Sequence, residues 1–178
     1  CIFCTKMDKS KLIEFECIDA YTAGNPVRLV VGPKPDLKGN NISEKRLNFI
    51  SNFDWIRKGL MFEPHGHDMM SGSFFYNPSD IKNDVSILFI ETSGCLPMCG
   101  HGLIGAITVL IEEGLVIPKV EGKINVETPA GLVKATYKKK DNKVISVKFN
   151  NVASFLAVSN LCVESEFLGK LKVDVAYG

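Results

Sequence analysis

The sequence predicts an α+β domain in which short strands are combined with a few helices. Residues 84–92 (DVSILFIET) are nearly all apolar in the middle, which is typical of a strand buried on both faces of a sheet. Residues 101–113 (HGLIGAITVLIEE) are apolar almost all round until the last turn, and Gly114 follows as a helix-terminating glycine, so a short helix buried in the domain centre is expected. Strand alternation recurs at residues 124–127, 133–137, 144–149 and 171–176.

The N-terminal part predicts a hairpin followed by a helix. Residues 15–21 and 26–32 are rich in β-branched or apolar side chains, and the turn at residues 22–25 joins them. Ser43 is placed to cap a helix that continues to about Leu60, because the apolar residues in between recur at helical spacing. No repeat or low-complexity tract interrupts the chain.

Composition points to a small-molecule partner. The 178 residues suffice for one globular domain, and 21 Lys and Arg against 20 Asp and Glu give a net charge of +1. That balance predicts neither nucleic acid nor a membrane as partner. No apolar run reaches the roughly 18 residues of a membrane span, and the start lacks the apolar region of a signal peptide. We therefore expect a cytoplasmic protein whose six cysteines are free thiols.

The segment Met98-Cys99-Gly100-His101-Gly102 carries the chemistry. It lies between the predicted buried strand and buried helix, where unpaired N–H groups and the helix dipole favour a thiolate and lower its pKa below the usual value of about 8.5. The same N–H groups can hold a substrate carboxylate, and the glycines allow close approach. A Cys99 base beside that carboxylate suits proton abstraction at the adjacent carbon. On spacing alone, Cys99 as a small buried apolar residue is the alternative.

Several further motifs occur in a characteristic order. They are residues 18–28 (IDAYTAGNPVR), 54–64 (DWIRKGLMFEP), 66–73 (GHDMMSGS), 91–102 (ETSGCLPMCGHG), 128–133 (TPAGLV) and 173–178 (VDVAYG). Together they resemble the proline racemase family over nearly the whole chain, and within it the hydroxyproline epimerases.

This resemblance implies a diaminopimelate-epimerase-like fold, with strands wrapped around a central helix, as one half of a pseudo-symmetric two-domain enzyme. Each domain supplies one catalytic cysteine, the first falls on Cys99, and the amides of Gly100 and His101 bind the substrate carboxylate, with the His101 ring also facing the substrate. The family's second cysteine motif, Asp-Arg-Ser-Pro-Cys-Gly-Thr-Gly, does not occur here. We therefore interpret residues 1–178 as the N-terminal domain, with residues 1–6 as a candidate non-native leader and the C-terminal domain outside this chain.

Ser71 is the candidate for substrate selection. The resemblance implies that proline racemases carry an aromatic residue at this position, packed against the bare pyrrolidine ring. A serine makes that wall polar and roomier, which favours hydroxyproline over proline. The alternative is that Ser71 only occupies a turn before Gly72.

The activity implied is inversion at Cα of 4-hydroxyproline by two thiols, one removing a proton and the other delivering one to the opposite face. No cofactor, metal or pyridoxal phosphate is expected. Proline racemisation, dehydration of 3-hydroxyproline and a non-catalytic half-domain that binds proline-like ligands are the alternatives. The sequence leaves the oligomeric state open, with a homodimer as one candidate.

Three sets of residues have spacings that would suit a metal ion. They are Cys1 with Cys4; His65 with His67 and Asp68; and Cys95 with Cys99 and His101. A metal on Cys99 would prevent its use as a base, so the metal and thiol interpretations exclude each other, and we expect no metal.

Overall fold

A computed structural model describes residues 13–177 of the chain. The expected leader at residues 1–6, and with it the Cys1 and Cys4 pair, lies outside the described residues. The elements are β1 (Glu16–Thr22), β2 (Asn25–Gly32), α1 (Ile42–Asn52), α2 (Asp54–Met61), β3 (Ser71–Tyr76), β4 (Val85–Glu91), α3 (Gly100–Glu112), β5 (Lys123–Thr128), β6 (Gly131–Lys140), β7 (Lys143–Asn150), β8 (Phe155–Ser165) and β9 (Gly169–Tyr177).

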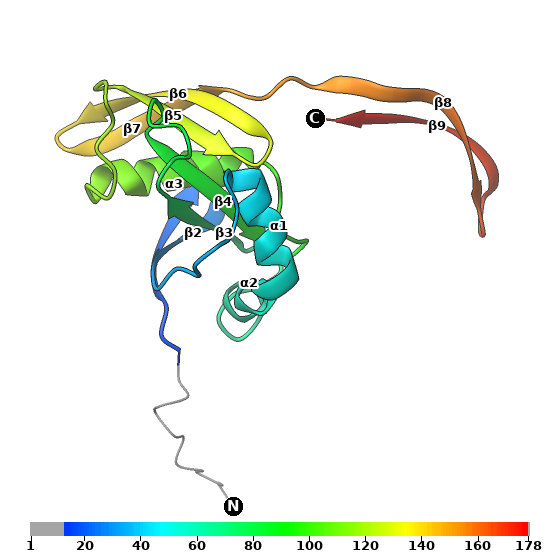
Figure 1. Ribbon diagram of the computed structural model, residues 1–178, viewed down its shortest axis with the longest axis horizontal. Helices are drawn as coiled ribbons and strands as arrows, with labels where there is room; N and C mark the ends of the chain where they lie inside the picture. Colours follow the sequence, from blue (N-terminus) through cyan, green and yellow to red (C-terminus); the bar gives the residue numbers. More distant parts are fainter. Residues whose placement is uncertain (1–12, 178) are drawn as a thin grey trace, which may run out of the picture.

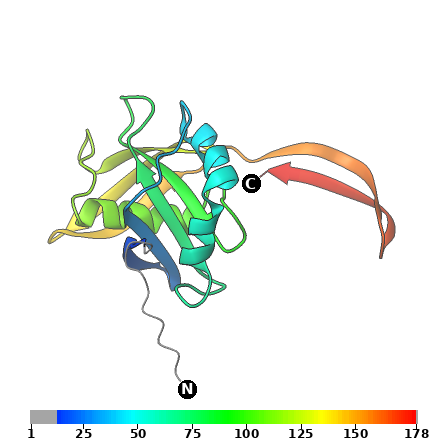
Figure 2. The same cartoon turned by 60° about the horizontal axis from the view of Figure 1, so that its bottom comes forward.

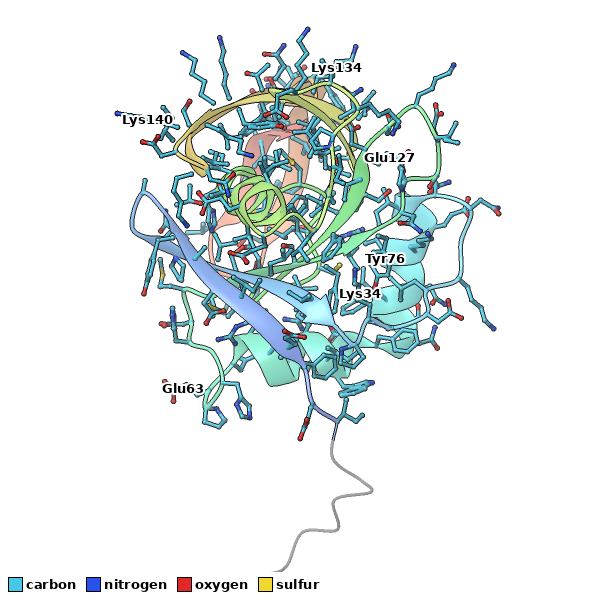
Figure 3. All side chains as sticks on the ribbon, turned by 90° about the vertical axis from the view of Figure 1, so that its left-hand side faces the viewer. Lys34, Glu63, Tyr76, Glu127, Lys134 and Lys140 are labelled. Carbon is cyan, nitrogen blue, oxygen red and sulfur yellow. The ribbon has the colours of Figure 1, made fainter. Side chains whose placement is uncertain are left out.

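Seven strands form one mixed sheet that curls around α3. Their order is β1-β2-β3-β4-β5-β6-β7, with β2/β3 and β4/β5 parallel and the other neighbours antiparallel. The helix contacts β1, β2 and β3 on one side and β7 on the other, so both ends of the sheet close on it. Figure 3 looks along α3 and shows the strands arching over and under it. The α+β fold with strands wrapped around a central helix is confirmed.

The predicted strand and helix at the domain centre are both present. In β4, Ile87 and Phe89 belong to the core around α3, whereas Leu88 and Ile90 belong to a second core beneath α1 and α2. The strand is thus buried on both faces, which explains its continuous apolar run. Figure 1 shows α1 and α2 on the side of the sheet away from α3. The expected glycine follows α3, since Gly114 has φ +64°.

The helix predicted from Ser43 to Leu60 is wrong in two respects. Its N-cap is Asn41, whose side-chain oxygen accepts a 2.9 Å hydrogen bond from the Glu44 amide. The segment is also divided into α1 and α2 at Phe53, where φ is −129° and ψ 8°. Apolar spacing reports which face is buried and is insensitive to one non-helical residue between two helices that share a core.

Strand β3 escaped prediction because it opens with Ser71, Gly72 and Ser73, which do not favour strands. Gly72 leaves room for Met61, since a Cβ atom there would lie 2.6 Å from the Met61 methyl group at the end of α2 and the methionine side chain would have to move. Ser71 is the first residue of β3 and pairs with Glu91 across to β4. The interpretation of Ser71 as a turn residue is therefore wrong.

The last two strands stand apart from this body. β8 and β9 form a two-stranded sheet that pairs with no other described strand, and Figure 2 shows the hairpin extending away from the curled sheet. Apolar side chains are exposed along it, among them Phe155, Leu156, Phe167 and Leu168. The sequence predicted only the second of these strands. Among residues 13–177, no helix has both the length and the apolar character to cross a membrane.

Candidate active site

Cys99 stands at the N-cap of α3, after the loop that follows β4. Its backbone is extended, with φ −142° and ψ 113°, and the Gly102 amide donates a 3.4 Å hydrogen bond to Sγ. The thiol therefore occupies the place that a serine or aspartate side chain takes at an ordinary helix start. Only 7% of Cys99 is exposed, so the sulfur lies within the end of the domain rather than on its surface.

The start of α3 is closely packed around position 102, which favours a glycine there. A Cβ atom on Gly102 would lie 3.0 Å from Cys99 Sγ and 3.3 Å from Ser71 Oγ. The amides of Gly100 and His101 precede this point, and the first N–H groups of an α-helix have no acceptor within it. Among residues 13–177 neither amide has a hydrogen-bond acceptor. These two donors and the positive end of the helix dipole lie at the same helix end as the thiol, an arrangement that suits an anionic group.

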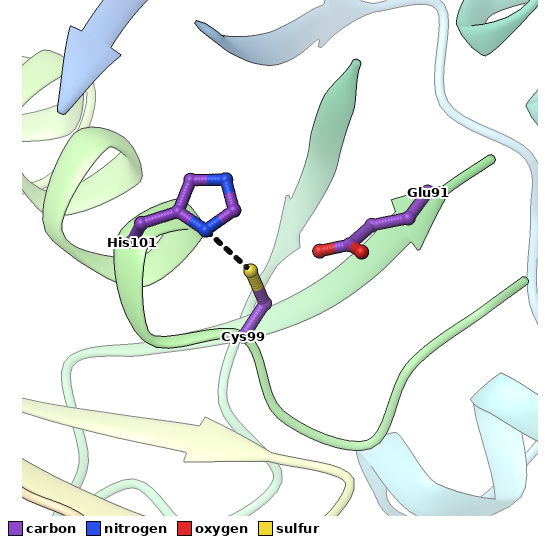
Figure 4. A group of neighbouring side chains, drawn as sticks. All are labelled: Glu91, Cys99 and His101. Carbon is purple, nitrogen blue, oxygen red and sulfur yellow. Dashed lines mark hydrogen bonds between the residues drawn. The ribbon is translucent and has the colours of Figure 1, made fainter. Parts of the chain in front are cut away.

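Two polar side chains lie close to the sulfur. Ser71 Oγ lies 3.7 Å from Cys99 Sγ, and His101 Nδ1 lies 3.5 Å from it, as Figure 4 shows for the histidine. His101 Nε2 is buried and has no hydrogen-bond partner among the described residues. Cys99, Gly100, His101 and Ser71, the four residues expected from the sequence, are therefore brought together at one helix end.

Glu91 is the member of this group that the sequence did not reveal. It is the last residue of β4, and its Oε1 accepts a 3.1 Å hydrogen bond from Ser71 Oγ. The carboxylate is directed toward Cys99 and His101 (Figure 4). Its register partner in β3 is Ser71, so strand pairing places both side chains on the face that meets α3. The sequence feature that could have identified Glu91 is its position as an acidic residue at the end of an otherwise apolar buried strand.

The expected low pKa of Cys99 is wrong for this structure. Burial, and after it the neighbouring Glu91 carboxylate, raise the pKa of the Cys99 thiol to about 11, although the Gly102 amide acts in the opposite direction. Helix-end stabilisation of a thiolate is thus outweighed by desolvation and by a like charge. At neutral pH the sulfur carries its proton.

The metal-ligand sets differ from those considered in the sequence. Within residues 13–177, the ligand atoms of Glu91, Cys99 and His101 lie within 4.8 Å of one another, so this trio replaces the set that included Cys95. The residues from His65 to Asp68 form no comparable group in that part of the chain. Because the trio includes the thiol, metal binding and proton transfer by Cys99 would compete for the same sulfur.

A hollow of about 340 Å³ lies beside the start of α3. Its walls include Leu96, Pro97 and Met98 from the loop before Cys99, Gly100 from the first turn of the helix, and Tyr177 from the end of β9. Gly100 is the site residue in its walls, whereas Cys99, His101, Ser71 and Glu91 are not among them, so this open space lies beside the first turn of α3 and not over the thiol.

The fold resembles solved structures at low sequence identity. A hydroxyproline epimerase from Agrobacterium vitis, with bound trans-4-OH-L-proline, superposes with a TM-score of 0.79 at 23% identity, covering 92% of this chain and 48% of that one. A probable proline racemase from Agrobacterium radiobacter K84, with bound carbonate, gives 0.79 at 24% identity, covering 92% and 49%. At these identities the likeness establishes the shared fold.

Curated proteins show closer sequence similarity. The chain is 61% identical over 165 residues to the 4-hydroxyproline 2-epimerase of Spirosoma linguale and 58% identical over 164 residues to 4-hydroxyproline 2-epimerase 2 of Brucella anthropi. Each alignment covers 92% of this chain and 49% of the relative, so the chain spans about half the length of these relatives. The family model described as proline racemase matches residues 17–178. The chain belongs to the proline racemase family.

Proposed function

We propose that this chain forms one half of the active site of a 4-hydroxyproline 2-epimerase, with Cys99 as one of two catalytic thiols. The observation that carries the proposal is the thiol of Cys99 beside the free amides of Gly100 and His101, in a chain 61% identical to a relative of that name. The Agrobacterium vitis neighbour, which shares the fold and holds trans-4-OH-L-proline, supports the same substrate class.

The geometry suits proton transfer at Cα of an α-amino acid. A substrate carboxylate on the amides of Gly100 and His101 brings the adjacent Cα to the helix end where Cys99 Sγ lies. One thiol on each face of Cα completes the reaction, because the first removes the α proton and the second supplies another from the opposite side. We propose that this exchange needs no metal or organic cofactor.

Ser71 is the proposed contact for the ring hydroxyl. Its own hydrogen is donated to Glu91, since a carboxylate only accepts, which leaves the lone pairs of Oγ free to accept a hydrogen bond from a substrate hydroxyl. Proline lacks that donor, so this contact favours hydroxyproline.

The compartment and assembly complete the proposal. We place the enzyme in the cytoplasm, a choice supported by the free state of Cys17, Cys95, Cys99 and Cys162 within the described residues. A homodimer is compatible with the proposal.

The test compares this chain with a version extended through a second cysteine-bearing domain. Each hydroxyproline isomer is incubated in D₂O, with α-deuterium followed by NMR and stereochemistry by chiral chromatography. The extended protein should invert and deuterate Cα, whereas the 178-residue chain should not invert it, because the chain supplies a thiol to one face only. Comparable turnover by the short chain would contradict the two-thiol proposal.

A further inference from the structure

Glu91 brings a negative charge to the site that the described part of the chain does not neutralise. None of the ion pairs formed within residues 13–177 involves it. Its backbone is held firmly, since its amide donates to the Gly94 carbonyl at 2.8 Å and its carbonyl accepts from Arg57 Nη1 at 2.8 Å. Ser71 Oγ is the hydrogen-bond donor to its side chain, whereas a carboxylate offers about four acceptor positions. A fixed anion with spare acceptor capacity therefore faces the thiol.

An α-amino acid carries charges that match the two ends of this site. Its carboxylate suits the free amides of Gly100 and His101, and its ring nitrogen, bonded to the same Cα, carries a positive charge at neutral pH. Glu91, Cys99 and His101 have ligand atoms within 4.8 Å of one another, so an ammonium group at Glu91 leaves Cα beside the sulfur.

We propose that Glu91 is a substrate-binding residue that receives the ring ammonium group of hydroxyproline. The inference rests on the proposed function, because it requires an α-amino acid at Cys99. The helix amides, Glu91 and Ser71 then contact three different groups of the substrate, namely the carboxylate, the ring nitrogen and the hydroxyl. Three contacts with the substrate fix its orientation and so define which face of Cα meets Cys99.

The ion pair between Glu91 and the substrate ammonium group also changes how readily Cys99 loses its proton. In the free site, burial and after it the Glu91 charge keep the proton on sulfur, so Cys99 starts as the proton donor. While the opposite thiolate takes the α proton and that C–H bond breaks, the Cys99 S–H bond breaks and its proton forms the new C–H bond. The thiolate left on Cys99 then lies beside an ammonium–carboxylate pair instead of an isolated carboxylate, which lowers the cost of its negative charge.

The experiment separates recognition of the ammonium group from general damage to the site. In the two-domain enzyme, Glu91→Gln removes the charge while keeping the shape of the side chain. The KM for 4-hydroxyproline should rise about tenfold or more, since a charge-assisted hydrogen bond is lost. The inhibition constant of pyrrole-2-carboxylate should change less than about twofold, because its ring nitrogen is uncharged. Glu113→Gln, the same change at the exposed far end of α3, should alter neither value.

A second readout reports the charge itself. Glu91→Gln should speed alkylation of Cys99 by iodoacetamide about threefold to tenfold, since a larger fraction of the thiol ionises. Cys95 is an internal control, because burial also raises its pKa to about 11, without a contribution from Glu91.

Each outcome decides the inference. Equal changes in KM and in the inhibition constant, or no change in either, would overturn it, because Glu91 would then serve the fold or pair with a protein cation. If Glu91→Gln fails to fold, Glu91→Asp replaces it and should raise KM with the inhibition constant unchanged. Absence of epimerisation by the unsubstituted two-domain enzyme would instead refute the proposed function.

Discussion

Two glutamates near opposite ends of β4 illustrate how the same kind of side chain can have different roles. Glu127, on the neighbouring strand β5, lies opposite Ser86 at the start of β4, whereas Glu91 ends that strand at the thiol. The Glu127 carboxylate accepts hydrogen bonds from the amides of Ser79 and Asp80, from Asn83 Nδ2 and from Ser86 Oγ, at 2.7 to 2.8 Å. Although burial acts in the opposite direction, these donors lower the pKa of Glu127 to about 2.

The difference lies in how many donors each carboxylate has. Glu127 is fully satisfied by groups of its own chain and fastens the loop between β3 and β4 to β5, which is a structural task. Glu91 receives one serine hydroxyl and raises the pKa of a nearby thiol, so its remaining acceptor capacity is available to a ligand. Donor saturation therefore distinguishes the structural carboxylate from the one we assign to substrate binding.

The largest effect is expected at the Glu91 end of β4. In the two-domain enzyme, Cys99→Ser should reduce kcat for epimerisation by about 10³-fold or more, because an alcohol is a far poorer proton donor and acceptor than a thiol. Cys162→Ser, in the exposed hairpin, is the matched control and should leave kcat unchanged. Chiral chromatography of the product measures both. Retention of most activity by Cys99→Ser would show that this helix end is not the reacting centre.

The next effect is expected at the Glu127 end and concerns stability. Glu127→Gln should lower the free energy of unfolding at pH 7 by about 2 kcal/mol, because charge-assisted hydrogen bonds to four donors are weakened. Urea unfolding followed by circular dichroism measures the change. Glu121→Gln, an exposed neighbour, should have little effect.

The pH dependence of the same variant sharpens this comparison. Because the folded pKa of Glu127 is depressed, to about 2 from an ordinary 4.5, its contribution is present above pH 4.5 and is lost as the pH falls toward 2. The difference in stability between the parent and Glu127→Gln should therefore shrink over that window. A constant difference from pH 7 to pH 2 would show that the ionised form of Glu127 contributes nothing to the fold.

Local patterns predicted the centre of the fold but not the contacts that depend on strand pairing. The apolar runs predicted β4 and α3, because a strand buried on both faces and a helix buried all round have few polar positions. The sequence also located Cys99 through its place before a helix. Glu91 escaped because its neighbour Ser71 is 20 residues away and reaches it only through the register of β3 with β4.

The same limit explains the wrong sign predicted for the pKa of Cys99. The helix end, which lowers a thiol pKa, is a local feature and visible in the sequence. Burial and the Glu91 charge, which raise it, come from packing between segments that are separate in the chain. β3 was missed for a related reason, since Gly72 is explained by the close approach of the Met61 side chain and not by any local strand preference.

The smallest expected effect concerns Ser71, which lies between Glu91 and the thiol and connects the proposed charge and hydroxyl contacts. Replacement by phenylalanine would not test the hydroxyl contact alone. Ser71 is 2% exposed and its Oγ lies 3.7 Å from Cys99 Sγ, so a large ring would displace the thiol itself. Ser71→Ala removes only the hydroxyl.

In the two-domain enzyme, Ser71→Ala should lower kcat/KM for 4-hydroxyproline about fivefold relative to proline, since only the former loses a hydrogen-bond partner on its ring. Ser73→Ala is the matched control: Ser73 lies two residues along the same strand, is fully buried, and its Oγ has no hydrogen-bond partner among the described residues. It should leave the ratio of the two substrates unchanged. If Ser71→Ala instead lowers kcat/KM equally for both amino acids, Ser71 acts by orienting Glu91, and the ring hydroxyl must be recognised elsewhere in the site.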